Sequence, residues 1–157
     1  MKAKAISLVL PLVFASVVVG FVANQDNPNL GTWKLNEANS KIPAGAPKNT
    51  TVTYEAAGDM IKVTVDGVDA AGKPTHSEWT GKFDGKDYSV TGDATSDTRS
   101  YKVVDKRTLD FAGKKAGKTT LSGRIVLSPD GKSRTVTVTS MTADGKKVES
   151  TAAYDKQ

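Results

Sequence analysis

The sequence contains no cysteine, only one histidine and few aromatic residues, which make up 6% of the chain. The absence of cysteine excludes disulfide bonds, thiolate metal ligands, a cysteine nucleophile and lipid attachment at an N-terminal cysteine. A zinc site needs several His or Cys ligands, and His76 alone cannot provide one. We therefore expect no metal site and no cofactor, and a fold that depends on its hydrophobic core and its strand pairing.

The sequence also lacks a recognisable set of catalytic residues. A Ser-His-Asp hydrolase would place His76 beside a serine nucleophile and an acidic residue, but no serine lies in a nucleophile elbow. The paired carboxylates Asp93 and Asp97 lie in a predicted turn, where aspartate is favoured because it hydrogen-bonds to the nearby backbone. We therefore expect that the protein is not an enzyme.

No long run of one charge occurs in the chain. Its formal net charge is +5, from 22 Lys and Arg residues against 17 Asp and Glu residues. Basic clusters are as short as Lys114-Lys115 and Lys146-Lys147. A nucleic-acid-binding surface usually has a basic stripe interleaved with aromatic residues. That pattern is missing, so we expect a soluble surface and no nucleic-acid partner.

The one long apolar stretch follows Lys2 and Lys4 and ends at Val22. A basic segment followed by an apolar one is typical of a secretory signal peptide. We expect a signal peptide over residues 1–23 and a mature domain over residues 24–157, in a secreted or periplasmic protein. The alternative is an uncleaved N-terminal anchor, because about 18 apolar residues can span a bilayer. No other stretch is apolar enough, so we expect no stable membrane insertion after cleavage.

What the sequence has in abundance is turn residues at a regular spacing, with Thr- and Val-rich segments between them. The turns recur roughly every 8 to 15 residues, which is the spacing of consecutive β-hairpins. They are Gly58-Asp59, Ala71-Gly72, Asp84-Gly85, Gly92-Asp93, Ser128-Pro129-Asp130-Gly131 and Asp144-Gly145. A series of hairpins has to close on itself or pack on a second sheet.

The segments between the turns read as strands. They are Gly31–Asn36, Thr50–Ala56, Met60–Val68, Pro74–Phe83, Lys86–Thr91, Thr98–Val104, Arg107–Ala112, Lys118–Leu127, Ser133–Met141 and Lys147–Tyr154. Apolar residues alternate with polar ones, as Ile61, Val63 and Val65 do, which indicates a sheet with one buried face and one solvated face. We predict an all-β, monomeric protein, an antiparallel up-and-down β-barrel of about 8–10 strands. A flattened barrel or a sandwich is the alternative.

The connection from Glu37 to Lys48 is predicted to be irregular. Pro43, Gly45 and Pro47 lie within it, and together they exclude a long helix. The chain therefore offers no helical segment that could cover an end of the barrel.

Two short segments resemble the calycin superfamily. Gly31-Thr32-Trp33-Lys34-Leu35 is similar to the Gly-x-Trp opening of lipocalins and to the Gly-Thr-Trp-Lys-Leu opening of fatty-acid-binding proteins. Asp144-Gly145-Lys146-Lys147 and Tyr154-Asp155-Lys156 look like the closing hairpin and tail of the fatty-acid-binding branch. The leader and the missing helical lid look more like bacterial lipocalin-like secreted proteins. The resemblance implies a barrel that binds a small molecule inside.

The resemblance does not extend to the carboxylate clamp of the fatty-acid-binding family. The arginine two positions before the terminal tyrosine corresponds to Ala152 here, and the inward arginine of the eighth strand corresponds to Gly123. A ligand should therefore be neutral or weakly polar. In lipocalins a late-strand arginine often covers the Gly-x-Trp indole, which implies structural roles for Trp33 and for Arg124 or Arg134.

The candidate ligand-binding residues are aromatic or branched side chains expected on the inner face. They are Tyr54, Val63, Val65, Trp79, Phe83, Tyr101, Phe111, Val136 and Val138. Their alternative role is ordinary core packing, because such residues fill cores as readily as they line cavities. We expect a non-catalytic barrel that binds a small hydrophobic ligand if a cavity remains between them. If they fill the interior, we expect a ligandless structural or interaction domain of the cell envelope.

Overall fold

The computed structural model describes residues 26–142 and 144–157, so the predicted signal peptide lies outside the described residues. The described part of the chain forms ten strands and no helix, and therefore no helix that could cross a membrane. The strands are β1 (Gly31–Lys41), β2 (Lys48–Ala57), β3 (Met60–Val68), β4 (Pro74–Gly81), β5 (Tyr88–Thr91), β6 (Thr98–Asp105), β7 (Thr108–Lys115), β8 (Lys118–Leu127), β9 (Ser133–Met141) and β10 (Lys147–Lys156).

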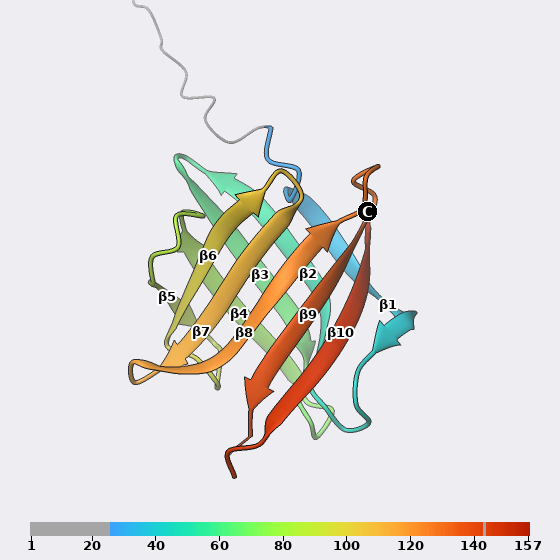
Figure 1. Cartoon of the computed structure of the whole chain (residues 1–157), viewed down its shortest axis with the longest axis vertical. Coiled ribbons are helices and arrows are strands. Elements are labelled where there is room, and N and C mark those ends of the chain that lie inside the picture. The colour runs from blue at the N-terminus through green and yellow to red at the C-terminus, as the bar shows by residue number, and fades with distance from the viewer. Residues whose placement is uncertain (1–25, 143) are drawn as a thin grey trace, which may run out of the picture.

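These strands form one closed antiparallel barrel (Figure 1). Each strand pairs with the next along the chain, and β10 returns to pair with β1. In this closing ladder Trp33 lies opposite Lys156 and Leu35 lies opposite Tyr154. The predicted all-β, up-and-down barrel is confirmed, with ten strands in the described part of the chain.

The first strand is longer than predicted. It was expected to end at Asn36, but a bulge lies between Asn36 and Lys41 and the strand resumes against β10. The Ser40 hydroxyl stabilises this bulge, because it donates to the Asn36 carbonyl at 2.6 Å and accepts from the Ala153 amide at 2.9 Å. The Pro- and Gly-containing connection then begins only after Lys41, so the predicted irregular segment is shorter.

The barrel has two different ends (Figure 1). The end with the β2–β3, β6–β7 and β8–β9 turns and the C-terminus is called the upper end here. The opposite end, with the β3–β4, β7–β8 and β9–β10 turns, is the lower end. A buried segment around Asn29 precedes β1 and contacts Trp33 at the upper end.

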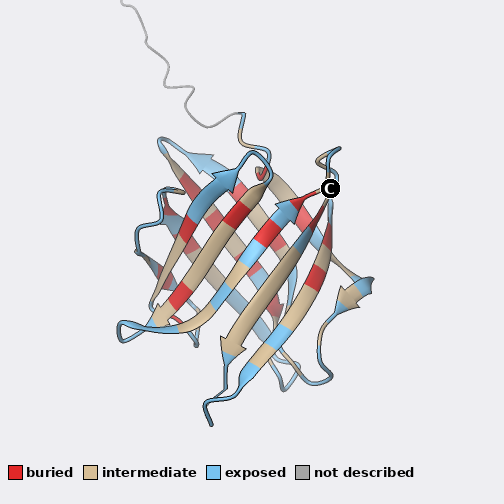
Figure 2. Ribbon diagram, in the orientation of Figure 1, coloured by how far each residue is buried: buried red, intermediate tan, exposed pale blue. Residues whose placement is uncertain are grey.

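Burial is uneven around the interior. On β3 the inward-facing Ile61, Val63 and Val65 are all buried. On β9 the inward-facing Val136 and Val138 are only half-buried, and Figure 2 shows intermediate burial along most of that strand. These side chains face inward by their register, so the interior packing covers them less completely than it covers the side chains of β3.

Candidate binding site in the barrel interior

Trp33 closes the upper end of the barrel. Its side chain is fully buried, and its indole Nε1 donates to the Asn29 carbonyl at 2.8 Å. The guanidinium carbon of Arg134 lies 4.5 Å from the centroid of the Trp33 ring. The same guanidinium lies 4.9 Å from the Tyr54 ring and 5.1 Å from the Tyr154 ring. Three aromatic rings therefore surround one buried cation, an arrangement that stabilises it by cation–π attraction.

Of the two arginines that the sequence named as candidates to cover Trp33, Arg134 occupies that place and Arg124 does not. Arg124 faces outward on β8, where its Nε and NH2 donate to the two carboxylate oxygens of Asp110 at 2.6 and 2.9 Å. Arg134 faces inward on β9, opposite Tyr154 of β10. The difference is one of strand parity, since side chains of adjacent residues point to opposite faces of a sheet.

Below Trp33 the interior holds a cluster of aromatic rings. Trp79 lies at its centre, with ring centroids 4.8 Å from Tyr101, 5.8 Å from Tyr88 and 6.2 Å from Phe83. The predicted aromatic site residues all belong to this cluster or contact it. They are Tyr54, Trp79, Phe83, Tyr101 and Phe111. These rings offer a planar, apolar surface on which another ring could pack.

The predicted valines fall into two groups. Val63 and Val65 are buried in the core. Val136 is half-buried and packs against that core, and Val138 lies closer to the lower end. Their role in ligand binding stays a prediction.

Two residues that the sequence analysis did not select, Arg99 and Asp93, form an ion pair inside the wall. The Arg99 NH2 donates to the Asp93 carboxylate, and only 12% and 11% of their side chains are exposed. Arg99 shares the inward face of β6 with Tyr101. Burial raises the pKa of Tyr101 well above its ordinary value, so this phenol stays neutral. Arg99 lies two residues before the predicted inward Tyr101, and this spacing along one strand could have predicted that Arg99 also faces inward.

The interior therefore contains two guanidinium groups but, among the described residues close to them, one carboxylate. The Nε of Arg99 and the Nε and NH1 of Arg134 are buried without a hydrogen-bond partner in the described part of the chain. Burial raises the pKa of Tyr154 to about 12, although the neighbouring Arg134 opposes the shift. Neutral phenols, the Asp93-paired guanidinium of Arg99 and the guanidinium of Arg134, for which no carboxylate partner is found among the described residues, together make the interior a donor-rich, positively charged environment.

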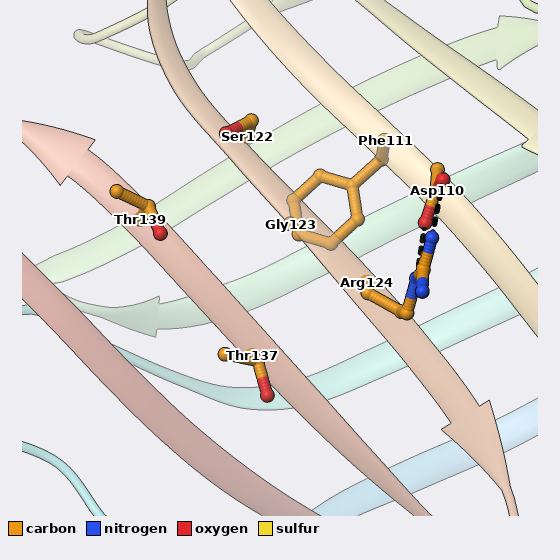
Figure 3. Close-up of a pocket in the computed structure, with 7 residues that line it drawn as sticks. All are labelled: Asp110, Phe111, Ser122, Gly123, Arg124, Thr137 and Thr139. Atoms are coloured by element: carbon orange, nitrogen blue, oxygen red, sulfur yellow. Dashed lines mark hydrogen bonds and ion pairs between the residues drawn. The ribbon is translucent and has the colours of Figure 1, made fainter.

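Two hollows lie on the outer wall. The first, of about 360 Å³, lies over Gly123, and the Asp110–Arg124 ion pair forms one of its sides (Figure 3). Phe111 packs against Gly123 from inside, where a Cβ would overlap its ring. The second, of about 390 Å³, lies between β4 and β5. Most of their lining residues face outward by register, so neither hollow is an interior cavity.

His76 belongs to a charged network on the outer wall of β3 and β4. Its Nδ1 lies 2.7 Å from an Asp66 carboxylate oxygen, and its Nε2 lies 3.8 Å from Glu78, which also pairs with Lys62. The hydrogen bond to Asp66 raises the pKa of His76. Within residues 26–142 and 144–157, no group of His, Cys, Asp or Glu side chains is placed to hold a metal ion.

Asp66→Asn is expected to lower the pKa of His76 towards its ordinary value of about 6.5, because the partner that favours the imidazolium is lost. In the wild type this interaction stabilises the fold fully below the pKa of the unfolded chain. The stabilisation is lost as pH rises through the higher folded pKa. Proton NMR of the single imidazole measures both variants without overlap. Asp110→Asn, distant on the outer wall, is the control, and a wild-type midpoint at or below the ordinary value would contradict the prediction.

No protein-family model and no curated protein sequence matches the chain. Two solved structures of similar architecture are EF1p2_mFAP2b bound to DFHBI and the redesigned β-barrel mFAP1, also bound to DFHBI. The first is 11% identical with a TM-score of 0.49, over 83% of this chain and 94% of that chain. The second is 14% identical with a TM-score of 0.45, over 82% and 95%. At such identities the likeness concerns the fold alone, and TM-scores this low support no argument about function.

Proposed function

We propose that this protein is a secreted or periplasmic, calycin-like barrel that binds a small molecule in its interior without catalysis. The ligand has an apolar, planar body and one anionic, hydrogen-bond-accepting group. The observation that carries the proposal is the pair of buried guanidinium groups, Arg99 and Arg134, with N–H groups that have no partner among the described residues.

Buried polar atoms in folded proteins nearly always have a hydrogen-bond partner, and each exception calls for an explanation. An unpaired buried charge is especially costly, because it has lost its water without gaining a counter-charge. Asp93 neutralises Arg99, and aromatic rings partly compensate Arg134. An anionic group bound beside Arg134 would satisfy its remaining donors and balance the interior charge.

The sequence predicted a neutral or weakly polar ligand because Ala152 and Gly123 replace the arginines of the fatty-acid-binding clamp. We replace that expectation, since Arg99 and Arg134 bring guanidinium groups to the interior from other strands, β6 and β9. The rest of the interior remains apolar. Its aromatic cluster suits the body of the ligand, as burial against rings is favourable and leaves few polar groups unpaired.

The basic and apolar pattern of the first residues supports the location, and the absence of a catalytic set from the sequence supports binding without chemistry. A ligandless envelope domain is the second candidate. It is favoured by one observation, that both hollows lie on the outer wall rather than inside the barrel. In that case the rings around Arg134 serve stability alone.

The test compares the binding of an aryl carboxylate with that of its uncharged primary amide, measured by quenching of the fluorescence of the two tryptophans. We expect the carboxylate to bind about ten-fold more tightly or better, because a charge-assisted hydrogen bond contributes about 1.5–3 kcal/mol. Arg134→Met is expected to abolish this preference. Arg124→Met removes the same charge from the outer wall and is expected to leave the preference unchanged.

Native mass spectrometry of protein from its own host's secreted or periplasmic fraction gives an independent answer. A reproducible bound mass that is lost on denaturation would support the proposal. A bare protein mass, together with no binding of either probe, would overturn it and favour the ligandless domain.

A further inference from the structure

The barrel wall is weakest at β5. This strand has four residues, and it pairs with β4 at two positions and with β6 at two positions. The next shortest ladder, between β1 and β2, has four paired positions. Local opening of a protein occurs preferentially where the fewest hydrogen bonds and contacts must be broken. The two ladders of β5 are therefore the place where this wall opens at the lowest cost.

Beyond one point the two strands of the β4–β5 ladder separate. Their last pair towards the upper end is Trp79 opposite Val90. Continuing that register would place Thr80 opposite Ser89 and Gly81 opposite the residue before it, but neither position is paired. A gap in the backbone hydrogen bonding is thus built into the wall beside Trp79.

The side chain of Tyr88 fills this gap. A Cβ on Gly81 would come within 2.6 Å of the Tyr88 ring, so the ring can pack there only because residue 81 is glycine. The ring meets Trp79 edge-on, with centroids 5.8 Å apart. The Tyr88 hydroxyl donates to the Asp84 carboxylate at 3.0 Å, and this exposed hydrogen bond keeps the ring in place against Gly81.

The hollow of about 390 Å³ on the outer wall opens onto this gap. It is lined by Glu78, Trp79, Thr80, Tyr88, Ser89 and Thr91. Of these, Trp79 and Tyr88 face inward and belong to the aromatic cluster, so the hollow borders that cluster directly. The Trp79 Nε1 donates to the backbone carbonyl of Arg99 at 2.9 Å, so the indole lies next to β6 at Arg99.

We propose that the β4–β5–β6 seam is the ligand's entrance: Tyr88 leaves Gly81, the wall parts beside Trp79, and the ligand passes from the outer hollow to the aromatic cluster and Arg99. This inference rests on the proposed function and adds the route. The upper end is a poor alternative, because Trp33 and Arg134 close it with side chains that are at most 3% exposed. The route through the lower end passes along β9 and β10 and is the competing possibility.

A reversible lock across the seam tests the route. Thr80→Cys with Ser89→Cys places two thiols on the outward side of the gap, and the native chain has no cysteine to interfere. A disulfide requires Cα atoms within about 7 Å, so its formation holds the strands together. Thr135→Cys with Ala153→Cys, a directly paired position on β9 and β10, is the matched control.

Stopped-flow fluorescence with the aryl carboxylate then measures association and dissociation. Oxidising the seam pair is expected to slow both rates about ten-fold or more, with little change in the dissociation constant, and dithiothreitol is expected to restore them. The control pair is expected to have no effect. Asp84→Asn, which weakens the hold on Tyr88, is expected to accelerate both rates. Equal rates in the oxidised and reduced seam variant would overturn the proposal in favour of the lower end.

Hydrogen exchange of the ligand-free wild type tests the opening without any probe. The amides of β5 are expected to exchange before those of the β2–β3 and β8–β9 ladders. Equal protection of β5 and those ladders would overturn the seam as an opening. Fast exchange at β5 with no probe binding by any variant would instead overturn the proposed function, and with it the assignment of this seam as an entrance.

Discussion

Trp33→Ala is expected to lower the free energy of unfolding by about 3–5 kcal/mol, the usual cost of removing a fully buried large aromatic side chain. The substitution removes the indole that closes the upper end. It also leaves the Arg134 guanidinium buried beside a cavity and exposes the Asn29 carbonyl that accepted the indole N–H. Urea denaturation followed by circular dichroism measures the loss.

Trp33→Phe is the matched variant. It keeps a ring under Arg134 but cannot donate to Asn29, so it is expected to cost roughly one hydrogen bond, about 1 kcal/mol, in addition to its smaller volume. If Trp33→Ala were as stable as Trp33→Phe, the upper end would be held closed by the strand ladders rather than by the indole.

Gly92→Ala is expected to destabilise the barrel by more than about 2 kcal/mol, from two separate causes. The residue has φ = +75°, a left-handed conformation that costs a non-glycine residue about 1–3 kcal/mol. In addition, an added Cβ would overlap the carbonyl oxygen of His76, so the backbone of β4 would have to shift. Overpacking of this kind costs typically about 1–3 kcal/mol.

Gly117→Ala separates these causes. Gly117 has nearly the same φ, +76°, but nothing lies within 4 Å of the position of its Cβ. It is expected to show the conformational cost alone. Thermal unfolding of both variants measures their losses of stability, and the difference between the two losses is the cost of the overlap with His76. Equal losses would show that the backbone relieves this overlap at no cost.

The sequence predicted the strands well because each strand is a local pattern. Alternation such as that of Ile61, Val63 and Val65 fixes which residues face inward, and turn dipeptides fix where strands end. The ten strands of the barrel follow from these two signals. The largest departure, the continuation of β1 to Lys41, depends on a hydrogen bond between Ser40 and Ala153 of β10, a strand near the far end of the chain.

The composition of the interior was harder to predict, because it depends on which strands face one another across the closed barrel. Parity alone was enough to separate the inward Arg134 from the outward Arg124. It did not show that Tyr54 and Tyr154 would complete a ring of aromatics around Arg134. Arg99 was overlooked because its partner, Asp93, lies in a turn, where an aspartate is ordinarily explained by backbone hydrogen bonding.

Closure between β1 and β10 has a consequence for the order in which the protein folds. Asn36 and Asp155 are 119 residues apart along the chain, yet their side chains are hydrogen-bonded at 2.8 Å. Pairings this distant in sequence form slowly, because a long loop must close before the contact is made. The indole of Trp33, on the first strand, is covered by Arg134 of β9 and Lys156 of β10. During synthesis the largest apolar side chain of the first strand thus stays open to water, or to a chaperone, until the last strand is complete.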